Sequence, residues 1–302
     1  MYSTSVKQVL QQEIEKHSLP FDFFDTIENW YIPIAQEIAR QHQQKKDTLL
    51  INVNGSQGSG KSTLTAFLSL ILTHHFGLNT IDISIDDFYL TKAQRKKLSK
   101  DVHPLLATRG VPGTHDIQLA VDCMQKLSHK QSCTLPQFNK AIDDRASEKS
   151  WKQIDKPVDI ILFEGWCTAA PFQEKEALQN PINTLESEED PDGVWRSYVN
   201  EQLKAYHQHL FNLSDYLIFL QIPNFEKVYE WRWLQEEKLA LTASDNQAVM
   251  TRQQVHRFIQ HYERITRNCL ELLPDKANMT VKLSDNHNIV SLDYSGQSPI
   301  KD

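Results

Sequence analysis

One short stretch decides how this chain folds: Gly55-Ser56-Gln57-Gly58-Ser59-Gly60-Lys61-Ser62-Thr63. It fills every fixed place of the phosphate-binding pattern G-x-x-x-x-G-K-[ST]. Glycines let the backbone turn tightly, so that its N–H groups face inward as an anion-binding nest. A helix that follows such a loop adds its unpaired N–H groups and the positive end of its dipole. In this pattern Lys61 reaches the β- and γ-phosphates of a nucleotide, and the Ser62 hydroxyl ligates Mg²⁺. We therefore expect the whole stretch to bind ATP.

The flanking sequence supports this interpretation of the stretch. Residues 48–53 form a short apolar run, as expected of a buried parallel strand. From Lys61 to Phe76 the apolar residues recur with helical spacing, and Gly77 follows where a helix C-terminus favours a left-handed residue. Strand, loop and helix are thus in the order that the phosphate-binding motif requires.

Composition limits the classes of protein that need to be considered. The chain has 302 residues, of which 40% are hydrophobic and 24% charged, as in ordinary soluble globular proteins. Its net charge of −7 argues against nucleic-acid binding as the main role. The N-terminus has no apolar signal core and no run is long enough to span a membrane, so we expect neither a nucleic acid nor a membrane as partner. Four scattered cysteines without a C-x-x-C pair predict reduced thiols and a cytoplasmic location.

Acidic residues follow two of the predicted strands. The strand predicted over 79–85 leads into Asp86-Asp87-Phe88-Tyr89, and the apolar strand over 158–163 ends at Glu164. Ligands bind at the carboxyl ends of strands in open α/β sheets, so these carboxylates are expected near the phosphates. Glu164 then has the Walker-B position and would hold Mg²⁺ directly or through water. A helix cap or a solvated turn is the alternative explanation for the Asp pair.

Two loops carry candidate ligands for a second substrate. Residues 103–116 are rich in turn formers, yet contain Arg109, His115 and Asp116. Asp116 is equally well explained as the N-cap of the helix predicted after it. In the segment 134–145, Lys140 and Arg145 could meet an anionic substrate or simply lie in an exposed loop. The basic stretch 92–100 is expected to be a solvated surface helix or loop.

The order of elements predicts the fold class. Strands near 48, 79, 158, 215 and 280 alternate with helices, which predicts an α/β protein with a parallel sheet and helices on both faces. The phosphate loop at the first strand makes it a P-loop NTPase fold. We expect an N-terminal helical segment over 1–47, a P-loop domain over 48–294 and a loose tail over 295–302.

These motifs together resemble the P-loop small-molecule kinases, which include uridine kinase, pantothenate kinase and phosphoribulokinase. Within that group the chain is most similar to the D-glycerate 3-kinase family. The stretches that carry this resemblance lie between about residues 45 and 270 and are Arg109-Gly110-Val111-Pro112-Gly113-Thr114-His115-Asp116, Leu135-Pro136-Gln137-Phe138-Asn139-Lys140, Asp144-Arg145-Ala146, Phe163-Glu164-Gly165-Trp166, Glu230-Trp231-Arg232, Gln235-Glu236 and Met250-Thr251. One departure is the segment 140–145, which lacks the glycines of the family and so leaves the substrate open.

The resemblance implies a kinase that uses ATP and Mg²⁺ to phosphorylate a hydroxyl of D-glycerate or a similar sugar acid. Asp86 is then the general base, and Tyr89 belongs to the same Asp-x-Phe-Tyr motif and to the substrate site. Arg232 is expected to act as a lid arginine over the phosphates, although an ordinary ion pair on a helix surface would also explain it. A carboxylate-bearing acceptor calls for a cationic clamp, for which Arg109, Lys140 and Arg145 are candidates. His115 and Asp116 would bind its hydroxyls.

Two other functions are compatible with the sequence. The first is a kinase for another small acceptor, such as a nucleoside, a pantothenate-like compound or a sugar. The second is a P-loop protein that binds or hydrolyses ATP as a switch. The oligomeric state is not predicted.

Overall fold

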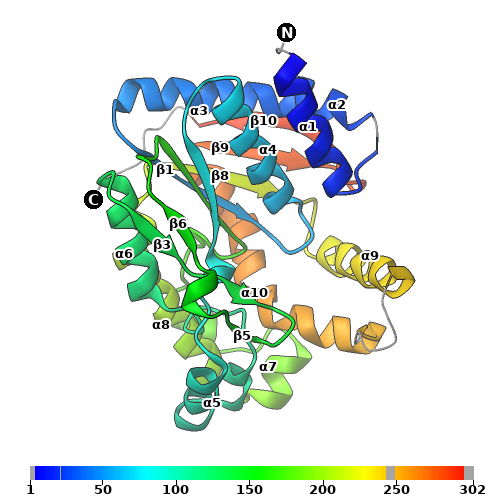
Figure 1. Ribbon diagram of the computed structural model, residues 1–302. Coiled ribbons are helices and arrows are strands. Elements are labelled where there is room, and N and C mark those ends of the chain that lie inside the picture. Colours follow the sequence, from blue (N-terminus) through cyan, green and yellow to red (C-terminus); the bar gives the residue numbers. More distant parts are fainter. Residues whose placement is uncertain (1–3, 21, 243–248, 296–302) are drawn as a thin grey trace.

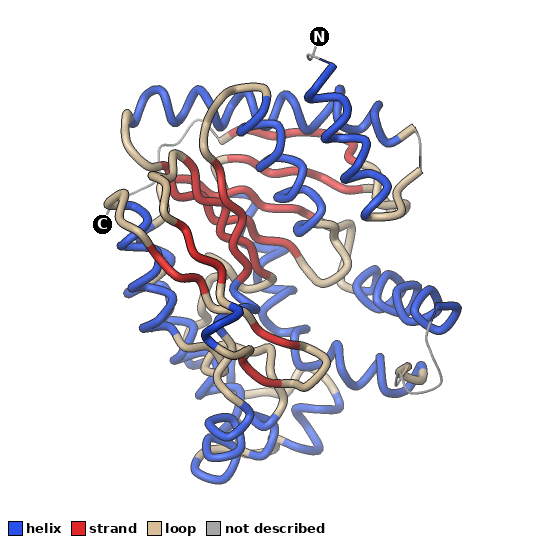
Figure 2. Tube along the Cα trace, in the orientation of Figure 1, coloured by secondary structure: helices blue, strands red, loops and turns tan. Residues whose placement is uncertain are grey.

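The structure is a computed structural model, and it describes residues 4–20, 22–242 and 249–295. Its centre is a six-stranded sheet with the strand order β10-β9-β8-β1-β7-β2 (Figures 1 and 2). The strands of this sheet are β1 (Leu49–Gly55), β2 (Thr80–Ser84), β7 (Ile160–Gly165), β8 (Tyr216–Gln221), β9 (Met279–Leu283) and β10 (Ile289–Tyr294).

The five predicted strands are all present and pair in parallel, which confirms the predicted fold class. The sixth strand, β10, was not predicted and runs antiparallel to β9. It lies at the edge of the sheet, where its side chains are exposed or only partly buried, so it lacks the apolar run that marks the inner strands. By contrast, every residue of β1 and β7 is buried.

Helices cover both faces of the sheet. One face packs against α6 (Ile117–Ser128), α8 (Val194–His209) and much of α10 (Arg252–Lys276). The other packs against α1 (Thr4–Lys16), α3 (Ile32–Lys45) and α4 (Lys61–His74). Successive residues of β1 pack alternately into the hydrophobic cores on the two faces of the sheet, because successive side chains of a strand point to opposite faces.

The N-terminal helices share the second core with the sheet. A continuous helical run comprises α2 (Phe23–Thr26), a π-helical turn (Ile27–Tyr31) and α3. Ile34 and Ile38 of α3 are fully buried in the same cluster as α4. The division of the chain at residue 47 stays a prediction, and residues 296–302 of the expected tail lie outside the described residues.

The chain between β2 and β7 builds a separate wall beside the sheet. It contains a 3₁₀ turn (Ile85–Phe88), α5 (Lys92–Asp101), a second 3₁₀ turn (Pro104–Ala107) and α6, followed by two short antiparallel ribbons. The ribbons are formed by β3 (Cys133–Leu135) with β6 (Lys152–Ile154), and by β4 (Phe138–Asn139) with β5 (Asp144–Arg145). Figure 1 places α5 at the end of the molecule away from α3, with α7 (Thr184–Glu189) nearby. Among the described residues, no helix combines the length and apolarity needed to cross a membrane.

Candidate active site

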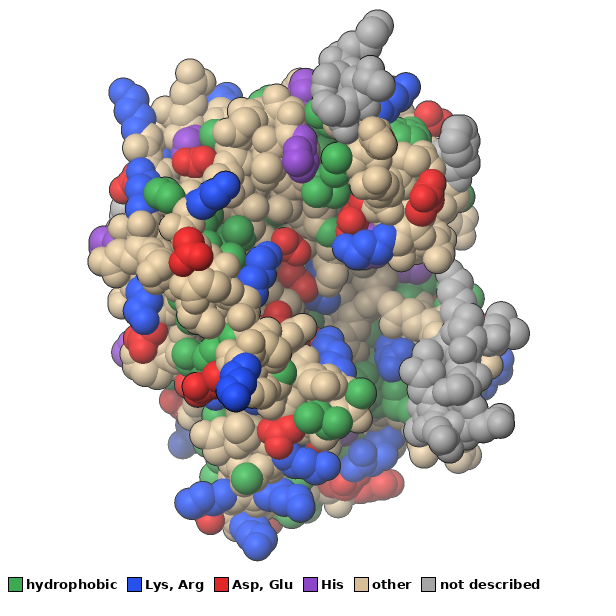
Figure 3. Space-filling model, viewed as in Figure 1, with side chains coloured by type: hydrophobic (Ala, Val, Ile, Leu, Met, Phe, Trp, Pro, Cys, Tyr) green, Lys and Arg blue, Asp and Glu red, His purple; other side chains and the backbone are tan. Residues whose placement is uncertain are grey.

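A cavity of about 770 Å³ opens where the carboxyl ends of β1, β2 and β7 meet. The space-filling view shows a hollow on this face with basic and acidic side chains around it (Figure 3). The lining comes from the phosphate loop, the end of β2, the wall segment and the facing parts of α9 (Glu226–Thr242) and α10. The cavity therefore lies where an open α/β sheet is expected to bind its ligands.

The predicted phosphate loop joins β1 to α4 and lines one side of the cavity. Gly60 caps α4 with a left-handed backbone angle, φ +87°, and Lys61 is the first helical residue. Gly58 also has a positive φ, +79°, and a Cβ atom there would lie only 3.0 Å from the Cβ of Trp231. The loop is thus held tightly against α9, and the N-terminus of α4 faces the cavity, as an anion site requires.

Ser62 and Glu164 lie together, as predicted for a Mg²⁺ site. The Ser62 hydroxyl donates to Oε1 of Glu164 at 2.9 Å, and Lys61 Nζ is 3.9 Å from Oε2. Glu164 is 6% exposed, and its Oε2 has no hydrogen-bond partner among the residues that the structure describes. A buried carboxylate oxygen without a bond, beside a hydroxyl, fits the oxygen ligands that Mg²⁺ prefers. No cluster of three or more His, Cys, Asp or Glu side chains occurs in the described parts of the chain.

Asp86 lines the cavity at the end of β2, where it contacts the wall through Lys140. Tyr89 donates its hydroxyl hydrogen to Oδ1 at 2.8 Å, and Lys140 donates to Oδ2 at 2.8 Å. Burial acts to raise the pKa of Asp86, but the charge and hydrogen bond of Lys140, with Lys61 nearby, outweigh it and hold this pKa below its ordinary value. The carboxylate is therefore ionised and able to accept a proton.

Asp87 has a different environment. Its Oδ1 accepts a hydrogen bond from the backbone N–H of Phe138 at 3.2 Å, and it does not line the cavity. Burial is the main cause that raises the pKa of Asp87. The two neighbouring acids are thus separated in position and in proton affinity, which favours Asp86 as the reactive one.

A buried arginine that the sequence did not reveal supports the wall of the cavity. Arg95 on α5 is 1% exposed and donates to three backbone carbonyls, of Leu90 at 3.2 Å, Ala107 at 3.0 Å and Asp143 at 2.7 Å. Its guanidinium also pairs with the Asp143 carboxylate at 3.0 Å, and Arg109 pairs with the other oxygen of the same carboxylate. The stretch 92–100 is therefore not simply a solvated surface, because one of its basic residues points inward.

His115, Asp116 and Arg145 lie behind this wall and not among the residues that line the cavity. The His115 ring stacks on Tyr89 with centroids 4.5 Å apart, and its Nδ1 is 3.1 Å from the Tyr206 hydroxyl. Asp116 caps α6 by accepting from the N–H of Leu119 at 3.2 Å, and its second oxygen accepts from Arg145 at 3.0 Å. Direct substrate binding by these three residues is not supported by this arrangement, since their polar groups serve to position Tyr89 and the loops.

Arg232 lines the opposite side of the cavity, as expected of a lid residue. It forms an ion pair with Glu236 one turn later on α9, and its guanidinium lies 5.7 Å from the centroid of the Phe258 ring. Glu236 is 2% exposed and also accepts from the backbone N–H of Met250 at 2.8 Å. Glu236 thus connects Arg232 to the start of α10.

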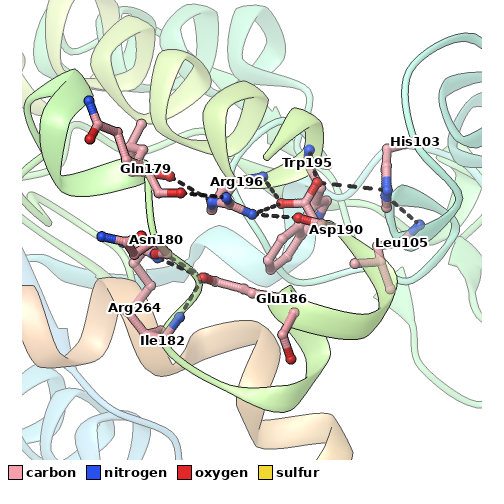
Figure 4. Close-up of polar contacts among 12 residues, drawn as sticks. His103, Leu105, Gln179, Asn180, Ile182, Glu186, Asp190, Trp195, Arg196 and Arg264 are labelled. Atoms are coloured by element: carbon pink, nitrogen blue, oxygen red, sulfur yellow. Dashed lines mark hydrogen bonds and ion pairs between the residues drawn. The ribbon is translucent and has the colours of Figure 1, made fainter. Parts of the chain in front are cut away.

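A buried ionic network supports the same wall from behind (Figure 4). Asp190 pairs with Arg196 at 3.0 Å and lies 3.9 Å from Nε2 of His103, whose Nδ1 accepts from the N–H of Leu105. Glu186, fully buried on α7, pairs with Arg264 of α10 at 2.6 Å. Asp190 connects this network to His103, which precedes the segment that carries Ala107, Thr108 and Arg109 into the cavity.

Comparison with known proteins identifies the family. The probable ATP-dependent kinase TDA10 of Saccharomyces cerevisiae is 30% identical over 274 residues, which cover 82% of this chain and 88% of that protein. The chain belongs to this family of P-loop kinases. The chloroplastic D-glycerate 3-kinase of Arabidopsis thaliana is also 30% identical over 253 residues, and this kinase spans about half of the plant protein's length, 52%. No protein-family model matches the chain.

Structural comparison agrees at the level of the fold. The D-glycerate 3-kinase of Cryptococcus neoformans superimposes with a TM-score of 0.74 at 24% identity, covering 89% of this kinase and 99% of that chain. The similarity therefore extends over most of the fold.

The structure brings together most of the residues that the sequence predicted for this kinase. Lys61, Ser62, Glu164, Asp86 and Tyr89 meet in the cavity. So do Arg109, Lys140 and Arg232. The sequence did not point to Arg95 or Asp143 as parts of the site. Arg95 lies on a helix without an apolar stripe, and the partners of Asp143, Arg95 and Arg109, are distant from it in the chain.

Proposed function

We propose that this kinase transfers the γ-phosphoryl group of ATP to a hydroxyl group of D-glycerate or a closely similar sugar acid. The observation that carries the proposal is the position of Asp86, which lies in one cavity with the phosphate loop and with the basic side chains of Arg109 and Lys140. A base for the hydroxyl and cations for a carboxylate are what a small hydroxy acid needs. The D-glycerate 3-kinase of Arabidopsis thaliana, 30% identical to this chain, supports the same acceptor.

The transfer follows from these positions. The triphosphate lies in the loop 55–63, and Ser62 with Glu164 would hold Mg²⁺, which when bound neutralises part of the phosphate charge. The acceptor oxygen attacks the γ-phosphorus and forms the new O–P bond. The bond from the γ-phosphorus to the bridging oxygen of ADP breaks, and Asp86 accepts the hydroxyl proton.

The remaining groups orient the reactants and stabilise the charge of the transition state. Lys61 contacts the phosphates, and Arg232 closes over them from α9. Arg109 and Lys140 bind the acceptor carboxylate, while Tyr89 keeps Asp86 in place through the 2.8 Å hydrogen bond. We also propose a cytoplasmic location, which the four free cysteines support.

The proposal is tested by ADP release from MgATP, measured alone and with D-glycerate, L-glycerate, uridine or pantothenate. Strong stimulation by D-glycerate is expected, and the Lys61→Ala variant should abolish it. Stimulation by uridine or pantothenate alone would move the acceptor to another class. A slow rate that no acceptor changes would support the ATP-switch alternative.

A further inference from the structure

The carboxylate of Asp143 occupies the place on Arg109 that an acceptor carboxylate needs. One oxygen is 3.0 Å from Nη2 of Arg95, and the other pairs with Nη1 of Arg109. The side chains of Asp143 and Arg109 are 34% and 31% exposed, whereas Arg95 is buried. Arg109 is thus the guanidinium that can turn toward a ligand, and an internal acid already holds it.

Arg95 cannot make the same exchange. Its guanidinium donates to three backbone carbonyls in addition to the Asp143 carboxylate, so a substrate would have to break the wall to reach it. Arg95 therefore fixes Asp143, and Asp143 in turn holds Arg109. Because the Arg109 pair is partly exposed to water, an acceptor carboxylate can replace the Asp143 carboxylate there, with a modest loss of affinity.

Five charged groups surround the expected position of the acceptor carboxylate, apart from Lys61, Glu164 and Arg232, which line the cavity on the nucleotide side. Arg95, Arg109 and Lys140 contribute three positive charges, and Asp86 and Asp143 contribute two negative charges. The excess of one positive charge matches a single carboxylate. A second anionic group on the acceptor would meet the Asp143 carboxylate.

The backbone conformation at Asp143 allows its carboxylate to be removed by substitution without a change in the loop. Its φ is +56°, in the left-handed region that Asn and Gly also adopt readily. Burial acts to raise the pKa of Asp143, but its bonds to Arg95 and Arg109 outweigh this and keep the carboxyl ionised. Replacement by Asn or Gly therefore removes the charge with little change in the backbone.

We propose that Asp143 is a specificity-determining residue, which holds Arg109 until an acceptor carboxylate replaces it and which restricts acceptors to those with one anionic group. The inference rests on the proposed function for the identity of the acceptor. In this role Asp143 selects against dianionic acceptors and lowers the affinity of the site for every anion.

The test compares Asp143→Asn and Asp143→Gly with the charge-matched control Asp144→Asn. The Asp144 side chain accepts from the N–H groups of Lys92 and Arg145, which an Asn oxygen can still do, and it does not line the cavity. Calorimetry without ATP measures binding of D-glycerate, malonate and glycerol, which carry one, two and no negative charges. Thermal unfolding verifies that each variant folds.

Both Asp143 variants should bind D-glycerate about tenfold more tightly than the wild type, since one like charge close to the ligand is removed. Malonate should gain a larger factor, and glycerol should change by less than about twofold. The control should behave as the wild type. Weaker anion binding in both variants, or an equal change for glycerol, would overturn the proposal, because Asp143 would then orient Arg109 or shape the loop.

The rate of ADP release and the KM for D-glycerate distinguish a failure of this proposal from a failure of the proposed function. If D-glycerate does not stimulate ADP release by the wild type, the acceptor assignment fails. The malonate comparison still decides the role of Asp143 in that case. If D-glycerate is phosphorylated and its KM is the same in all four proteins, the role of Asp143 fails while the function stands.

Discussion

Gly110→Ala should destabilise the protein by more than the cost of its backbone conformation alone, and it should also weaken acceptor binding. Gly110 has φ +138°, and a Cβ atom there would lie 2.4 Å from the hydroxyl oxygen of Tyr262. Tyr262 cannot easily move away, because it is buried and its ring packs edge-to-face against Trp166, with the ring centroids 4.8 Å apart. Trp166 in turn donates its indole N–H to the Gly110 carbonyl at 2.9 Å.

The expected magnitude has two parts. A non-glycine residue in this backbone region costs about 1–3 kcal/mol, and forcing an extra methyl group into packed surroundings costs about 1–3 kcal/mol more. Gly77→Ala is the matched control, because Gly77 has φ +69° with no atom within 4 Å of its Cβ position. It should cost only about 1–2 kcal/mol, the price of the backbone conformation.

Urea titration measures the free energy of unfolding of both variants, and steady-state kinetics measures the KM for the acceptor. Gly110→Ala should lose at least about 1 kcal/mol more than Gly77→Ala and should raise this KM, since Tyr262 and Arg109 line the cavity. Equal losses of stability with an unchanged KM would refute the packing argument.

Three further predictions follow from the site. Asp86→Asn should lower kcat by about 10²–10⁴-fold. Because the pKa of Asp86 lies below the ordinary 3.8, kcat/KM of the wild type should not decrease with falling pH until below about pH 4. If Asp87 were the base, its raised pKa would make kcat/KM decrease at a higher pH. Burial lowers the pKa of His115 from 6.5 to about 4. As the pH falls, His115 is therefore protonated in the unfolded chain before it is protonated in the folded one, and the free energy of unfolding should fall by about 3 kcal/mol between pH 6.5 and 4. His115→Gln should remove this part of the pH dependence in urea titrations. An unchanged pH dependence of the free energy of unfolding would contradict the prediction. Glu164→Gln should raise the Mg²⁺ concentration for half-maximal ADP release by tenfold or more, and an unchanged titration would rule out Glu164 as a ligand.

The fold was predictable because its signals are local. The phosphate loop, the apolar runs of the inner strands and Gly77 at the end of α4 each act through near neighbours in sequence. β10 was not predicted because it pairs at an edge of the sheet, where none of its residues is fully buried.

The site was predictable where strand ends bring residues together, and less so elsewhere. Asp86 and Glu164 follow parallel strands, so topology alone places them near the loop. Arg95 is one of several basic residues on α5, a helix without an apolar stripe, so its sequence does not reveal which one is buried. The motif 109–116 supplies Arg109 to the cavity lining. Its pattern does not distinguish residues that line the cavity from those, such as His115, that lie behind the wall.

The most direct test of the central claim is ³¹P NMR of a reaction with MgATP and D-glycerate. The claim is that the γ-phosphoryl group goes to the acceptor and not to water. We expect one phosphate monoester of glycerate per ADP formed, with little inorganic phosphate, and no such signal with the Asp86→Asn variant. ADP accompanied only by inorganic phosphate would contradict the account and make the protein an ATPase.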